Sequence, residues 1–188
     1  MKRLALSFMA LGVGWAAAFA QKNEVVPPPS CMNNEGEQVA FIDRSGGGRP
    51  DLAAGVAWRS KQGKPEVVRS NFSAATPDFQ KFIGLHECAH HQTGDVDLPH
   101  PPRNGPEHLY NEAFSDCIAI LRLRDEENYD ATGLGRVTAD MRSDMAKFGF
   151  PEISISSRIS NIENCYKRDG SAQDLVDARL KQRGLLLK

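Results

Sequence analysis

Residues 79–90 read FQKFIGLHECAH and end in the motif His-Glu-x-x-His. His86 and His90 are four positions apart, so on a helix they share one face and can direct their imidazole rings at the same ion. Glu87 lies about 100° round the helix from His86, near enough to reach a water on that ion without ligating the ion itself. Two imidazoles and a carboxylate base in this order are typical of a metal hydrolase.

The residues around the motif predict a helix over about 77–93. Thr76 suits the N-cap, Pro77 suits the first helical position and Asp78 adds an acid to the first turn. Gly94 can end the helix, and apolar residues at three- and four-residue spacing place the histidines on the core-facing stripe. The alternative is an amphipathic helix whose two histidines are unrelated. The context favours the metal site.

A second motif, Asn-Glu-x-x-Ser-Asp, follows at residues 111–116. It supplies the third protein ligand that a tetrahedral catalytic zinc needs. Over residues 76–117 the two motifs together resemble the thermolysin-like gluzincins, a family of zinc metallopeptidases. The metzincin pattern fits less well, because it requires a glycine and a further ligand where this chain has Thr93 and Val96.

The resemblance implies a role for each matched residue. His86, His90 and Glu112 would ligate one Zn²⁺, and Glu87 would be the general base. Asp116 would hold the ring of His86, and chemistry supports this, because a ligating histidine normally donates its second N–H to a carboxylate or carbonyl. Zinc would lower the pKa of its bound water toward about 7. The expected activity is therefore hydrolysis of peptide bonds in a peptide or protein substrate.

The N-terminal segment, residues 1–20, predicts a cleavable signal peptide, in which Lys2 and Arg3 precede an apolar core and an Ala-x-Ala cleavage site. The apolar run is shorter than the roughly 18 residues of a spanning helix. We therefore expect export to the periplasm or medium, with no membrane span after cleavage. Residues 21–30 predict a proline-rich flexible leader, and residues 31–188 a single domain.

The charge balance of the chain argues against some classes of partner. Without Lys2 and Arg3, the 23 basic residues fall to 21 against 24 acidic ones, a net charge of −3. Such a surface does not favour nucleic acid or an anionic membrane.

The cysteine count predicts two disulfides, because an even number behind a signal peptide is typical of exported proteins. Cys88 points away from the motif histidines on the helical wheel, so it should not touch the metal, and a bridge to Cys117 would be awkward. Three pairings remain possible. We favour an arrangement in which Cys31 and Cys165 each hold one motif helix, without assigning which helix each holds. The four candidates are Cys31, Cys88, Cys117 and Cys165.

The sequence predicts an α+β fold, with a small N-terminal antiparallel sheet followed by a helical half; the resemblance implies a minimal zincin-like arrangement. The strand expected at 66–72 is either an ordinary core strand or, as the resemblance implies, a strand that borders the cleft and pairs with the substrate backbone through Val67–Asn71. The proline-rich loop at 95–105 is expected on the rim of the cleft. The remaining expected elements are strands at about 39–43 and 55–60, a hairpin turn at 62–65, and helices at about 106–125, 136–148, 156–167 and from Ser171.

Two rival functions remain open. The first is a non-catalytic zinc-binding envelope protein, a pseudo-peptidase or a structural module, because no segment matches the oxyanion-stabilising side chains of the family. The second is a partner-binding module in which the motif is incidental. The intact Glu87 argues against the first, since a structural zinc needs no base. Arg158 is expected in a surface ion pair or as a support of the site. The candidates for oxyanion stabilisation are His100, His108, Tyr110 and Tyr129.

Overall fold

The computed structural model describes residues 23–44 and 49–185. The expected signal peptide therefore lies outside the described residues. Among the described helices, none combines the length and the hydropathy of a membrane-crossing segment. The elements are β1 (Ala40–Arg44), β2 (Ala54–Arg59), β3 (Pro65–Ser70), η1 (Phe72–Ala74), α1 (Pro77–Gln92), η2 (Asp95–Asp97), α2 (Pro106–Glu126), α3 (Ala131–Lys147), α4 (Glu152–Lys167) and α5 (Ala172–Gln182).

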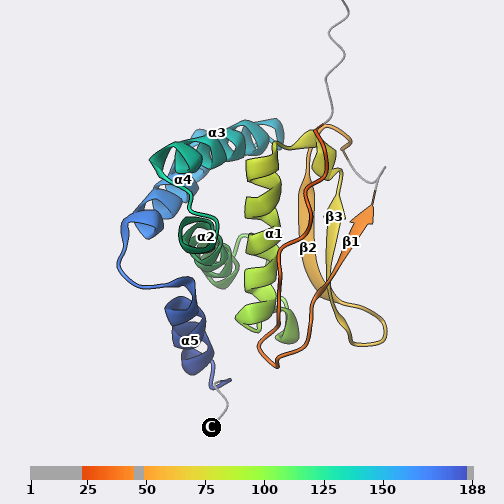
Figure 1. Cartoon of the computed structure of the whole chain (residues 1–188). Helices are drawn as coiled ribbons and strands as arrows, with labels where there is room; N and C mark the ends of the chain where they lie inside the picture. Colours follow the sequence, from red (N-terminus) through yellow and green to blue (C-terminus); the bar gives the residue numbers. More distant parts are fainter. Residues whose placement is uncertain (1–22, 45–48, 186–188) are drawn as a thin grey trace, which may run out of the picture.

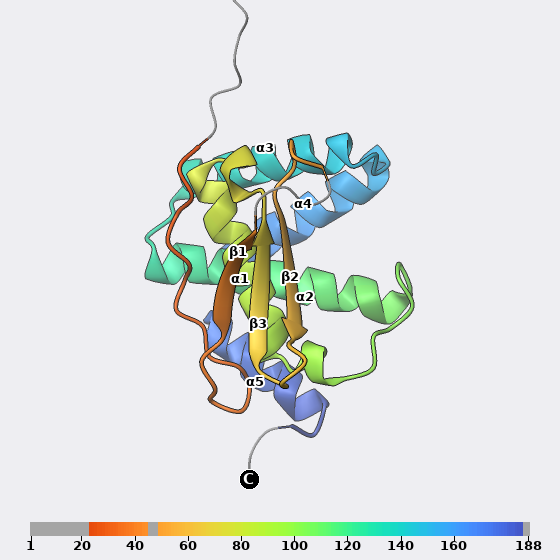
Figure 2. The ribbon, with the colours of Figure 1, turned by 90° about the vertical axis from the view of Figure 1, so that its right-hand side faces the viewer.

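The architecture is α+β, as expected, but the sheet is mixed and not purely antiparallel (Figure 2). Strands β2 and β3 form the expected antiparallel hairpin, with Arg59 opposite Pro65. Strand β1 runs parallel to β3, with Ala40 opposite Glu66. The sheet order is β1-β3-β2, because the hairpin folds back and inserts its second strand between the first two. The expectation of an antiparallel sheet is therefore wrong for β1.

Strand β3 is a core strand, and it cannot offer an edge to a substrate. Both of its edges are paired, with β1 on one side and β2 on the other. Val67 and Val68 are buried, which fits the central place of the strand. The idea that Val67–Asn71 borders the cleft is therefore wrong, and the strand that lines the cleft is the edge strand β2.

Helix α1 forms where the local signals predict it. The Thr76 hydroxyl accepts a hydrogen bond from the Phe79 backbone nitrogen at 3.3 Å, and Gly94 has a positive φ of 71° just beyond the helix. The helix lies between the sheet and the other helices (Figure 1). His91 faces away from the motif histidines, and its Nε2 lies 3.0 Å from the carbonyl oxygen of Glu66 in β3.

The helical half is built on α2, which packs against α1, α4 and α5. Helix α3 begins at Ala131, earlier than expected, because the side chain of Asp130 caps it by accepting from the Gly133 backbone nitrogen at 2.9 Å. Helix α5 begins with the expected capping box of Ser171 and Asp174. The buried apolar residues of α2 are Cys117, Ile118, Ala119, Ile120, Leu121 and Leu123.

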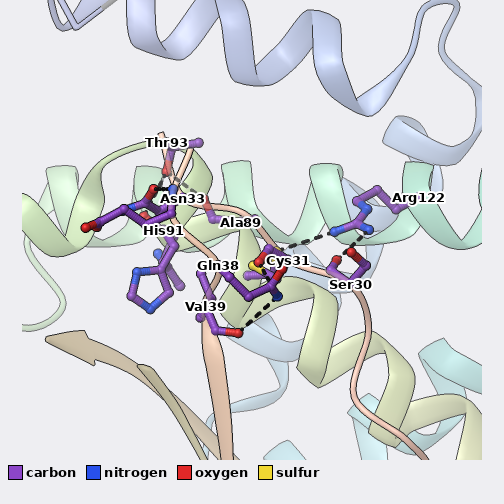
Figure 3. The surroundings of a disulfide bond; sticks show 12 residues. Ser30, Cys31, Asn33, Gln38, Val39, Ala89, His91, Thr93 and Arg122 are labelled. Carbon is purple, nitrogen blue, oxygen red and sulfur yellow. Dashed lines mark hydrogen bonds between the residues drawn. A yellow bond between two sulfur atoms is a disulfide. The ribbon is translucent and has the colours of Figure 1, made fainter. Parts of the chain in front are cut away.

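Two disulfides hold the motif helices, and Cys31 and Cys165 each bond to one of them, as we favour from the sequence, which leaves open which helix each holds. Cys31 bonds to Cys88 in α1, and Cys117 in α2 bonds to Cys165 in α4. Beside the first bond, the guanidinium of Arg122 lies 3.4 Å from the sulfur of Cys88. Figure 3 shows Arg122 next to Cys31. Two disulfides in a chain of this size are typical of an oxidising compartment.

The described part of the predicted leader, from Asn23 onward, runs extended along α1 (Figure 1). The backbone nitrogen of Val26 donates to the side chain of Gln80 at 2.9 Å, and that side chain donates back to the carbonyl of Glu24 at 2.9 Å. Arg69 in β3 donates to the carbonyl of Val26 at 2.9 Å. These bonds attach the segment to both layers of the fold.

Candidate metal centre

Three side chains from the two motif helices meet at one point. The Nε2 atoms of His86 and His90 lie 3.1 Å apart. The carboxylate oxygens of Glu112 lie 3.5 Å from Nε2 of His86 and 3.4 Å from Nε2 of His90. These three residues could hold a metal ion. Helices α1 and α2 thus bring together all three residues that the sequence predicts as ligands.

The spacing of these atoms matches a tetrahedral metal site. With bonds of about 2.0–2.1 Å, two ligand atoms of a tetrahedral zinc lie roughly 3.3–3.4 Å apart. The three separations, from 3.1 to 3.5 Å, fall around that value. Two imidazole nitrogens and one carboxylate suit zinc, but also other divalent metals. The fourth corner of the tetrahedron has no protein ligand among the described residues.

Each histidine is oriented by a carboxylate on its other ring nitrogen. Nδ1 of His86 lies 2.9 Å from Asp116, which is fully buried. Nδ1 of His90 lies 2.8 Å from Asp95 in η2, and the hydroxyl of Ser115 lies 3.2 Å from the same atom. Both rings therefore hold a proton on Nδ1 and present Nε2 to the common point.

Arg158 of α4 joins the carboxylates of the centre. Its guanidinium donates to both oxygens of Asp116, at 2.6 and 2.9 Å, and lies 3.3 Å from Glu112. The expectation of a surface ion pair is wrong, and Arg158 supports the site. The disulfide between Cys117 and Cys165 holds α4, and with it Arg158, against α2.

The charges around the two histidines control their protonation. Burial opposes a charged His86, but the hydrogen bonds and charges of Asp116 and Glu112 outweigh burial and raise its pKa to about 9. Burial likewise opposes a charged His90, and Asp95 and Glu112 raise its pKa to about 10. Burial alone would raise the pKa of Glu112, but the two histidines lower it well below its usual range. Metal binding must therefore displace protons from the imidazoles.

Glu87 lies against the free edge of β2. Its Oε2 accepts a hydrogen bond of 2.8 Å from the backbone nitrogen of Ala57. The approach is so close that a Cβ atom on residue 55 would lie 2.4 Å from Cγ of Glu87, so this position requires glycine. Both Gly55 and Glu87 line the cleft that contains the two histidines. Glu87 is thus beside the three candidate ligands without being one of them.

The centre lies in a cleft of about 1060 Å³. Strand β2 contributes one part of its lining, and α2, α4 and the loop after η2 contribute others. That loop was expected on the rim. Of the oxyanion candidates, His100 and His108 line the cleft, and Nδ1 of His108 is buried without a hydrogen-bond partner among the described residues. Tyr129 instead donates to Asp78, and Tyr110 packs beneath an arginine of α5.

Sequence reasoning missed the partner of His90. A ligating histidine needs an acceptor on its second nitrogen, and Asp95 is an acid five residues after His90, so a signal was present. No comparable signal marks Arg183, which forms an ion pair with Asp95 from the far end of the chain. No family model, curated protein or solved structure matches this chain, so the candidate site is argued from its own residues.

Proposed function

We propose that this chain is an exported zinc-dependent metallopeptidase that hydrolyses peptide bonds. The observation that carries the proposal is the convergence of Nε2 of His86, Nε2 of His90 and the carboxylate of Glu112 at tetrahedral spacing, with Glu87 beside them in an open cleft. The resemblance of the two motifs to those of the gluzincins supports the same assignment.

The residues divide the chemistry among them. His86, His90 and Glu112 would hold the zinc, which polarises a substrate carbonyl and activates a water. Glu87 would accept the proton of the attacking water and pass it to the leaving amine. Its hydrogen bond to Ala57 fixes one carboxylate oxygen at 2.8 Å and so restricts the direction of the other.

The shape of the cleft supports an extended peptide as substrate. The Ala57 N–H points away from β3 toward Glu87, so the unpaired edge of β2 borders the centre. An unpaired strand edge can bind an extended chain through main-chain hydrogen bonds. Val56 in β2 and Ile153 in α4 are exposed apolar residues that line the cleft, and they would contact side chains of such a peptide.

The alternative is a zinc-binding envelope protein without turnover. It would keep the ligands and the two disulfides but would not need Glu87 at the edge of β2. A site that serves structure alone normally has four protein ligands, whereas three converge here among the described residues. This difference favours the catalytic proposal.

Metal analysis and peptide cleavage together test the proposal. The purified mature protein is expected to contain about one equivalent of zinc and to cleave members of a peptide library. Chelation should abolish cleavage, and added zinc should restore it. A protein that binds zinc but cleaves nothing at full loading would support the envelope alternative. A protein that binds no zinc would contradict both.

A further inference from the structure

The two histidines of the centre are held by matching sets of residues. His86 bonds to Asp116, and Asp116 bonds to Arg158. His90 bonds to Asp95, which in turn forms an ion pair with an arginine of the C-terminal region, Arg183. Each imidazole therefore has its own carboxylate, and each carboxylate has its own guanidinium.

The second set joins distant parts of the chain. Arg183 is the C-cap residue of α5, while Asp95 lies in η2, just beyond the end of α1. Both side chains are largely removed from solvent, at 7% and 9% exposed. Figure 1 shows α5 beside the end of α1 from which η2 begins. The ion pair is therefore buried, and it joins the C-terminal end of α5 to Asp95, the carboxylate that orients His90.

The guanidinium of Arg183 also contacts both motif helices. It donates to the carbonyl of Thr93, the C-cap residue of α1, at 2.7 Å. It donates to the side chain of Asn111 at 3.0 Å, directly before the ligand Glu112. Arg179, one turn earlier in α5, donates to the same oxygen of Asn111 at 2.5 Å. One side chain therefore touches the helix of His90 and the helix of Glu112.

We infer that Arg183 is a positioning residue for the metal centre and that α5 completes this centre. The inference rests on the proposed zinc site and goes beyond its ligand set. A histidine that binds a metal ion is neutral. With His90 as its only partner, Asp95 would therefore be a buried negative charge without a positive charge beside it. Such a charge is costly without a cation. Arg183 supplies that cation, and as the ion-pair partner of Asp95 it holds the carboxylate beside His90.

The experiment measures zinc affinity by competition with a chromophoric chelator. Arg183→Met removes the charge but keeps most of the stem, and it should weaken zinc binding by about 10–100-fold, the range for a lost support of a ligand. Arg183→Lys keeps the charge and should recover part of the affinity. Lys181→Met, at an exposed position of the same helix, is the matched control and should bind like the native protein.

A double-mutant cycle with Asp95→Asn separates positioning from a general loosening of the fold. If Arg183 acts through Asp95, then Arg183→Met should change zinc affinity much less in the Asp95→Asn background. If Arg183→Met binds zinc as tightly as the native protein, the inference about Arg183 is overturned, while the proposed zinc site is unaffected. Equal losses in both backgrounds would also overturn the inference. A native protein that binds no zinc would remove the proposed function as well.

Discussion

The side chain of Glu87 in α1 lies so close to the backbone of Gly55 in β2 that there is no room for a methyl group between them. The two residues belong to different layers of the fold, the sheet and the first motif helix. This contact fixes the candidate base relative to the edge strand. The sheet therefore contributes to the site although it provides none of the three candidate ligands.

Gly55→Ala is expected to lower peptide cleavage by about 100-fold, because a displacement of about 1 Å in a reacting group can cost this much. The added Cβ would lie 2.4 Å from Cγ of Glu87, so the carboxylate must move. The zinc content should stay native, since Gly55 is not one of the three candidate ligands. Gly135→Ala in α3, where a Cβ meets nothing within 4 Å, is the control. A native cleavage rate for Gly55→Ala would contradict the role of Glu87.

Removal of a ligand should remove the metal. Native protein is expected to carry about one equivalent of zinc, and His86→Ala or Glu112→Ala close to none, because two remaining ligands cannot hold it tightly. Elemental analysis after dialysis measures the content. The control is Glu107→Ala, which changes an exposed glutamate of α2 and should leave the zinc content unchanged. Full occupancy in either ligand variant would show that the ligands are assigned wrongly.

Asp116→Asn should weaken zinc binding by about 10–100-fold while the three ligands stay in place. The substitution keeps the shape of the side chain but removes the charge that holds His86 and pairs with Arg158. Chelator competition measures the affinity. Asp125→Asn, at a more exposed position of α2, serves as the control. An unchanged affinity in Asp116→Asn would mean that the carboxylate does not orient the ligand.

The exported protein should contain both disulfides. Its unreduced mass is expected to be about 4 Da below that of the reduced chain, because two bonds remove four hydrogens. Peptide mapping should find Cys31 with Cys88 and Cys117 with Cys165. With sequence separations of 57 and 48, loop entropy predicts about 4 kcal/mol of unfolding free energy for each bond. Four alkylatable thiols in freshly isolated protein would contradict the prediction.

Much of the helical fold could be predicted because its signals are local. The Thr76 cap and Gly94 mark the limits of α1, and the capping box of Ser171 marks the start of α5. The parallel pairing of β1 could not be predicted, because strand order depends on contacts between distant segments. The early start of α3 was missed because Gly133 weakens the helical pattern, while the cap at Asp130 outweighs it.

The candidate site, like the fold, could be predicted only in part from the sequence. His86, His90 and Glu112 stand in motifs whose spacing predicts their convergence, and the structure brings them together. The supporting carboxylate Asp116 also follows from the second motif, but the supporting arginines do not follow from spacing, because Arg158 and Arg183 reach the centre only once α4 and α5 pack on α2. The sequence around an arginine does not indicate which carboxylate it will pair with in the fold.

The substitution Glu87→Gln tests whether Glu87 is the general base of a zinc peptidase. Glutamine keeps the size of the side chain and the hydrogen bond to Ala57, but it cannot accept the proton of the attacking water. At equal zinc loading, melting temperature and zinc affinity should stay close to native, while peptide cleavage falls by roughly 10²–10⁴-fold. Cleavage by Glu87→Gln at the native rate would contradict the account, because the activity would then belong to another site or another protein.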